Sequence, residues 1–236
     1  MPIIAKDVLA RAQIVLQDAG AKRWPLLDLL AWLNDGLRDI AFYKPTALSE
    51  TKVVDLVKGT LQELADGEQI MRAHRNIISE EGVTPRVAGL VATPIPREIL
   101  DAHMPEWHME TFQAPFQRAV CHVVTDQFNP RIFHVYPGNN GSGRIELTVS
   151  VTPETIPDPA GGAGAALAAY TQEIPINITY LSVLVDYVLY RSFSMDVQYA
   201  GAADRAVAHY QNFQNALGIK QQIEGATSPS QAQAAS

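Results

Sequence analysis

The densest set of side chains capable of chemistry lies between residues 101 and 108. Asp101, His103, Glu106 and His108 place carboxylates and imidazoles close together in the sequence, and such groups are common ligands of zinc and other transition metals. Pro105 interrupts the segment, so the spacing does not follow one face of a helix as a helical ligand motif requires. A small metal-dependent hydrolase that uses His103, Glu106 and His108 is therefore an alternative and not the leading interpretation.

Two further histidines lie on the two arms of a predicted hairpin. If Thr125 pairs with Arg131, His122 lies opposite His134, and two imidazoles would supply half of a tetrahedral metal site. A cross-strand surface pair is the simpler interpretation. Cys121 points to the other face of the strand, where we expect a small thiol in the core.

Other reactive motifs are incomplete. Gly161, Gly162 and Gly164 lack the preceding strand and the lysine of a phosphate-binding loop, and no serine lies in a nucleophile elbow. With one cysteine, the sequence offers neither an intrachain disulfide nor a cysteine zinc cluster. The sequence thus predicts no catalytic residue, no cofactor and no metal.

Composition limits the classes of partner. Of the 236 residues, 47% are hydrophobic and 18% are charged, which is the balance of ordinary globular proteins. The formal net charge of −7 argues against a basic surface that grips nucleic acid phosphates, although an acidic wall can line a DNA passage without adhering to it. Residues 1–6 contain no basic region followed by an apolar run, so we expect a cytosolic product.

Four segments show the helical spacing of apolar residues. Pro25 suits the first turn of the second helix and Pro45 ends it, whereas Gly20 is expected to close the first. The third is apolar on more than one face, but Asp186 and Arg191 interrupt it, so we expect a buried helix and no membrane span. The predicted helices are 4–19, with the apolar stripe Ile4, Val8, Val15, Leu16 and Ala19, then 26–41, 178–193 and 203–217, the last with the stripe Ala203, Val207, Tyr210, Phe213 and Leu217.

The middle of the chain changes to the period of two that is typical of strands. The clearest hairpin spans 119–136, and an exposed loop at 153–164 with nothing to bury leads back to the helices. We therefore predict an α+β fold in which N- and C-terminal helices form a bundle, with a β-rich insertion and a flexible C-terminal tail. The predicted domains are 1–48, 49–157, 158–217 and 218–236, and the predicted strands are 52–58, 69–75, 86–91, 119–125, 131–136 and 144–151.

Aromatic residues on the predicted helices are candidate anchors. We expect Trp24, Trp32, Tyr187 and Tyr190 either in the core or in contacts between subunits, because large rings dominate the energetics of both. Gly36 lies inside the second predicted helix, where a missing side chain allows a neighbouring helix to approach closely.

A set of short runs extends over nearly the whole chain. They are Trp24 with Leu29, WLNDGLRDIA at 32–41, Pro45, GTLQEL at 59–64, Arg75-Asn76, NPRIFHVYPG at 129–138 and DYVLYRSFSMD at 186–196. None of them is a catalytic signature. Together they resemble the adaptor proteins of bacteriophage head-to-tail connectors, such as tail tubular protein A of short-tailed phages.

The resemblance implies a subunit of a dodecameric ring below the portal protein, which joins the portal to the nozzle or tail. Double-stranded DNA would pass through the ring without sequence-specific contact, and the protein would assemble in the host cytoplasm and reside in the neck or tail of the virion. The C-terminal segment of such adaptors docks along the portal, and the candidate docking residues here are Leu217, Ile219, Lys220 and Ile223.

We therefore expect a non-enzymatic ring subunit whose helices face the portal and whose strands face the distal tail proteins. A tail-completion or tube-terminating protein would keep the structural role and change the partner. The metal-dependent hydrolase is the alternative from another class.

Overall fold

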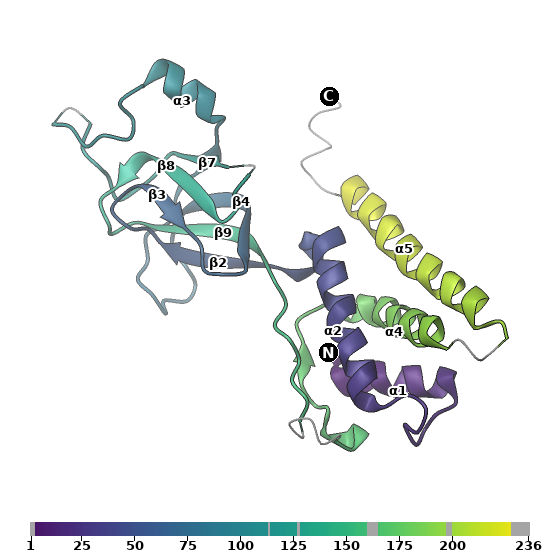
Figure 1. Cartoon of the computed structure of the whole chain (residues 1–236). Coiled ribbons are helices and arrows are strands. Elements are labelled where there is room, and N and C mark those ends of the chain that lie inside the picture. The colour runs from purple at the N-terminus through teal and green to yellow at the C-terminus, as the bar shows by residue number, and fades with distance from the viewer. Residues whose placement is uncertain (1–2, 113, 127, 160–164, 197–199, 228–236) are drawn as a thin grey trace. The chain divides into compact units, whose positions relative to one another are not determined.

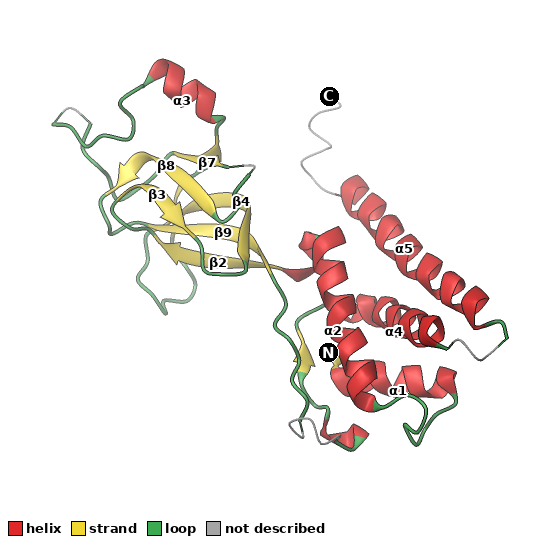
Figure 2. Ribbon diagram, viewed as in Figure 1, coloured by secondary structure: helices red, strands yellow, loops and turns green. Residues whose placement is uncertain are grey.

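The computed structural model describes residues 3–112, 114–126, 128–159, 165–196 and 200–227. These residues form both helices and sheets, so the fold is α+β as predicted (Figure 1). The chain divides into two compact units, a helical unit of Met1–Leu48 with Pro153–Ser236 and a strand unit of Ser49–Thr152 (Figure 2). Among the described helices, none has the length and apolar character needed to cross a membrane.

The helical unit contains one apolar core to which both ends of the chain contribute. Helix α4 packs against three others, because α1 and α2 contact it from the N-terminal part of the chain and α5 from the C-terminal part. A short antiparallel pair of strands, β1 with β10, joins the same two parts. The elements are β1 (Ile3–Ile4), α1 (Ala5–Leu16), α2 (Leu26–Tyr43), η1 (Pro45–Leu48), η2 (Leu167–Ala169), β10 (Glu173–Ile174), η3 (Ile178–Tyr180), α4 (Leu181–Met195) and α5 (Ala202–Thr227).

Helix α1 ends earlier than predicted and buries only part of the predicted stripe, with Val8 in the core and Leu16 packed against it. It stops at Leu16, and Gln17 takes the left-handed conformation that terminates it, so Gly20 is not its cap. The Asp18 carboxylate then accepts hydrogen bonds from the backbone N–H groups of three residues, Lys22, Arg23 and Trp24, and organises the turn into α2. The buried stripe is Ala5, Val8, Leu9 and Ala12, whereas the predicted stripe residue Val15 is 47% exposed.

Helix α2 follows its prediction closely. It begins after Pro25, ends before Pro45 and buries the predicted leucine stripe. Gly36 faces α4 so closely that a Cβ atom would lie 2.9 Å from the Tyr187 ring, which confirms the expected close approach. Asn34 is also buried on α2, and its side chain pairs with both the N–H and the C=O of Ile156.

The Asn34–Ile156 pair corrects the prediction for the returning loop. Ile156 is buried in the helical core, so the described part of segment 153–164 does have something to bury. The glycines at 161, 162 and 164 lie outside the described residues.

Helix α5 differs from its prediction at both the face and the end. Phe213 and Leu217 of the predicted stripe are buried, but in the first turns Ala202 and Ala206 are buried in place of Ala203 and Val207, and Val207 is 55% exposed. The helix does not end at Leu217 but continues to Thr227. Residues 228–236 of the predicted tail lie outside the described part of the chain.

The strand unit packs two sheets around a second apolar core. One sheet has the strand order β2-β9-β4-β5 and the other β3-β8-β7-β6. Alternation along β9 directs Ile145, Leu147 and Val149 into the core. The elements are β2 (Ser49–Asp55), β3 (Gly59–Glu63), β4 (Glu68–Ile77), β5 (Ala88–Val91), β6 (Thr93–Pro94), α3 (Arg97–His103), β7 (His122–Thr125), β8 (Ile132–Asn139) and β9 (Arg144–Val151).

The predicted hairpin is present, but its register differs. Thr125 pairs with Phe133, so His122 lies opposite Tyr136 and His134 lies opposite Val124. The connection is two residues longer on the β8 side than the assumed pairing allowed. Cys121, expected in the core, is exposed.

Substitution of alanine for Gly36 should destabilise the helical unit. Alanine favours helices over glycine by up to about 1 kcal/mol, but the Tyr187 ring leaves no room for the methyl group, and overpacking costs about 1–3 kcal/mol. Gly218→Ala is the matched control, because Gly218 lies in α5 with open space around it and the change should stabilise. Thermal unfolding of both variants measures whether each change stabilises or destabilises the protein. A stabilised Gly36→Ala variant would contradict the proposed close approach.

Candidate interaction surfaces

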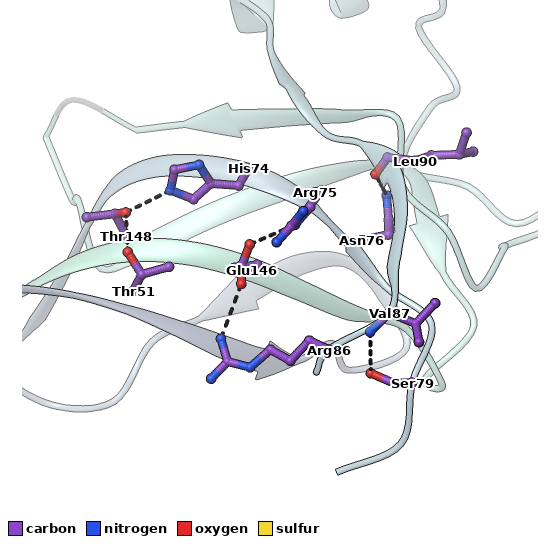
Figure 3. Close-up of polar contacts among 10 residues, drawn as sticks. All are labelled: Thr51, His74, Arg75, Asn76, Ser79, Arg86, Val87, Leu90, Glu146 and Thr148. Carbon is purple, nitrogen blue, oxygen red and sulfur yellow. Dashed lines mark hydrogen bonds and ion pairs between the residues drawn. The ribbon is translucent and has the colours of Figure 1, made fainter. Parts of the chain in front are cut away.

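The outer face of the sheet β2-β9-β4-β5 carries an ion-pair network (Figure 3). Alternation along β9 turns Glu146 and Thr148 away from the core residues of that strand. Glu146 accepts hydrogen bonds from Arg75 Nε at 2.8 Å and from Arg86 Nη1 at 3.2 Å. Burial alone would raise the pKa of Glu146, but the two guanidinium groups outweigh it and hold the pKa below its usual range.

Hydroxyl groups extend this polar face toward the edge strand β2 (Figure 3). Thr148 Oγ1 lies 3.0 Å from Thr51 Oγ1 and 2.7 Å from His74 Nε2. Arg144 adds a further cation, held by Asp55 and by the Ser79 carbonyl. The face therefore presents fixed guanidinium groups, each shared with a carboxylate, and can order a neighbouring polar surface.

Asn76, the neighbour of Arg75, makes its hydrogen bonds inside the unit instead. Its amide group donates to the carbonyls of Leu90 and Val120, and its oxygen accepts the Val120 N–H. The Arg75-Asn76 pair thus has two structural roles, because one side chain orders the outer face and the other joins β4 to the chain before β7.

A second cluster surrounds Trp107, after α3. The indole N–H donates to the Asp101 carboxylate at 2.8 Å, and the His108 ring lies 3.6 Å from the indole ring. His108 shares a hydrogen bond with Thr60, and its ring lies 5.4 Å from that of His134. Burial is the main cause that lowers the pKa of both histidines, and nearby Arg97 adds to it.

This arrangement uses the candidate metal ligands in other ways. Asp101 also pairs with Arg97, and His103 is exposed at the end of α3. The residues that the structure describes include no group of three His, Cys, Asp or Glu side chains placed to hold a metal ion. The segment instead forms a small core of Leu100, Trp107 and Val124 over the sheet.

The candidate anchors of the helical unit fall into two groups. Trp32 and Tyr187 are core residues, whereas Trp24 and Tyr190 are partly exposed at its margin. Burial, with Asp39 beside the hydroxyl, raises the pKa of Tyr187 to about 12. The candidate docking residue Leu217 is only 6% exposed and belongs to the core.

Three other candidate docking residues, Ile219, Lys220 and Ile223, lie on the last turns of α5. Helix periodicity alone does not predict this, because the apolar pattern stops at Leu217 while the backbone remains helical. Alanine and glutamine after Gly218 are acceptable helix formers and were the available signal.

An apolar groove between α4 and α5 was not predicted. It has a volume of about 540 Å³ and is lined by Tyr190 and Phe193 of α4 and by Val207 and Tyr210 of α5. The Tyr190 and Tyr210 rings are in contact, with centroids 4.7 Å apart. The exposed stripe of α5 was the signal that could have revealed it.

The described residues thus provide aromatic anchors, fixed ion pairs and an apolar groove, which suit contacts with other proteins. A protein-family model described as SU10 adaptor protein matches residues 4–234. The chain therefore belongs to the SU10 adaptor protein family, which is a family of phage structural proteins. No curated protein matches the chain.

Glu146→Gln should destabilise the strand unit at neutral pH. A hydrogen bond to a charged group contributes about 1.5–3 kcal/mol, so we expect the free energy of unfolding to fall by about 2 kcal/mol. Because the folded pKa is depressed, this contribution is present above the unfolded value of about 4.3 and is lost as the pH falls through the folded value. The difference between variant and wild type should thus shrink in acid.

The control is Glu63→Gln, which removes an exposed partner of Arg131 and should cost less than about 1 kcal/mol. Chemical unfolding at several pH values measures both. Equal losses of stability in the two variants would show that the Glu146 network contributes no more than an exposed ion pair.

The Trp107 cluster should weaken on acidification. The lowered pKa values of His108 and His134 mean that stability is complete above the unfolded histidine value of about 6.5 and is lost as the pH falls below it. His134→Gln should flatten this dependence, whereas His103→Gln, at an exposed position of the same segment, should not. Melting followed by tryptophan fluorescence tests this, and identical profiles for both variants would refute it.

Proposed function

We propose that this protein is a subunit of a ring that joins the phage portal to the tail or nozzle and lets double-stranded DNA pass. The observation that carries the proposal is the family match, which extends over residues 4–234 and so includes both units and the C-terminal segment. A ring of twelve, which the resemblance to tail tubular protein A proposed from the sequence would imply, requires each subunit to present two different surfaces to its neighbours, because closed rings use heterologous contacts.

The charge of the chain fits this role. A protein with a formal net charge of −7 repels DNA at long range, so a ring of such subunits would let DNA slide without adhesion. The guanidinium groups of Arg75 and Arg86 are already shared with Glu146, which moderates their attraction for phosphate.

In this proposal the helical unit contacts the portal through the end of α5. Leu217 fixes the helix to the core, and α5 continues beyond it as the segment that carries the candidate docking residues Ile219, Lys220 and Ile223. The strand unit would contact the distal tail proteins. An amphipathic helix that lies in a groove of its partner is a common mode of recognition.

Removal of residues 218–236 should weaken portal binding without unfolding the protein. The core ends at Leu217, so the melting temperature should change little, whereas binding should weaken at least about tenfold, or about 1.4 kcal/mol. A truncation that removes only 228–236 is the control and keeps all of α5.

Co-sedimentation with the portal protein of the same phage measures binding of both truncations. Undiminished binding by the shorter, folded chain would refute the docking role. Failure of the intact chain to bind any portal would refute the adaptor function itself and favour a tail-completion role.

A further inference from the structure

The groove between α4 and α5 is open because α5 buries only part of its apolar surface. Ala206 of α5 is buried, while Val207 on the same turn is 55% exposed and lines the groove with Tyr210. Tyr190 and Phe193 of α4 complete it. Its volume of about 540 Å³ lies in the range of about 300–1,000 Å³ that accepts ligands larger than one side chain.

A matching projection lies at the end of α2. Phe42 is 79% exposed and Tyr43 is 53% exposed, and their rings meet edge to face with centroids 5.3 Å apart. The helix that carries them is held rigidly by its leucine stripe in the core. Adjacent exposed aromatic rings on a rigid element are typical of interaction sites.

The projection cannot fill the groove of its own chain. Trp24, just before α2, lines a hollow together with Phe193 and Asp196, and both of these also line the groove. The groove is therefore near the start of α2, whereas Phe42 is at its end. Eighteen helical residues separate the two ends by about 27 Å, since each adds about 1.5 Å.

We propose that Phe42 and Tyr43 of one subunit insert into the α4–α5 groove of a second copy of this chain. The inference rests on the proposed ring, and it supplies the two different, complementary surfaces that a heterologous contact requires. Because the projection and the groove lie at opposite ends of α2, each copy can use both at once and the contact propagates.

The area of this contact explains when it forms. Two aromatic side chains bury about 150–250 Å² each, far below the total of about 1,200–2,000 Å² in stable interfaces. The contact alone therefore leaves the free protein monomeric at low concentration. It closes the ring where a partner such as the portal holds copies side by side, which raises their effective concentration.

Cysteine cross-linking tests the pairing on the full chain. In a Cys121→Ser background, Tyr43→Cys and Ala203→Cys copies are mixed at millimolar concentration with a mild oxidant. Ala203 is an exposed groove residue, so the mixed disulfide should exceed both homodimers severalfold. Ala31→Cys, exposed in the second turn of α2, replaces Tyr43→Cys in the control and should give only background cross-linking with Ala203→Cys. The proposal would be overturned if mixed disulfides and homodimers formed in statistical proportions, or if the control pair cross-linked as efficiently as the test pair.

Complementary variants give a second, independent readout. Phe42→Ala with Tyr43→Ala removes the projection, and Val207→Glu blocks the groove at an exposed position. Each variant alone should remain monomeric at millimolar concentration, whereas their mixture should form dimers that do not grow, since one projection and one groove remain. If either variant still assembles into rings on the portal, the proposal is wrong and the adaptor function stands; if the wild type fails to bind the portal but the cross-link forms, the adaptor function is wrong and the pairing stands.

Discussion

The helical unit depends on the close approach of α2 to α4 at Gly36. The Tyr187 ring occupies the space that a Cβ atom at this position would need, and the same tyrosine lies 5.1 Å from the Phe213 ring of α5. A single residue of α4 therefore links a helix from the N-terminal part of the chain to one from the C-terminal part. The approach thus adds to the common core that both parts form on either side of the inserted strand unit.

Asn34 strengthens the same arrangement from the other side of the insertion. Its buried amide satisfies both backbone groups of Ile156, where the chain returns from the strand unit. A buried polar side chain is stable only when its hydrogen bonds are made, so this pair also fixes the place at which the chain re-enters the helical core.

In the strand unit, successive side chains of a strand point alternately into the core and to the outer face. On β4, Asn76 joins the strands inside the unit while Arg75 points outward to Glu146. The result is a scaffold with an ordered charged surface on one sheet. The exposed aromatic pair at the end of α2 and the groove at its start would let such a scaffold associate weakly in solution and firmly on a template.

The sequence alone determined the α+β class, the start of α2 and its end to within two residues, and the phage adaptor family. These depend on local signals: a continuous leucine stripe, flanking prolines and family runs along the whole chain. Strand β9 was predicted with its observed limits, since its alternation is strict. Tertiary structure decided the features for which local sequence signals allow more than one outcome. Apolar residues on two faces of α1 and α5 allow either face to be buried, and packing against α4 selected the one that leaves Val15 and Val207 exposed. Two pairings of the β7–β8 hairpin keep the same faces, because the side-chain period is two, and the observed register places His134 beside His108 and Trp107.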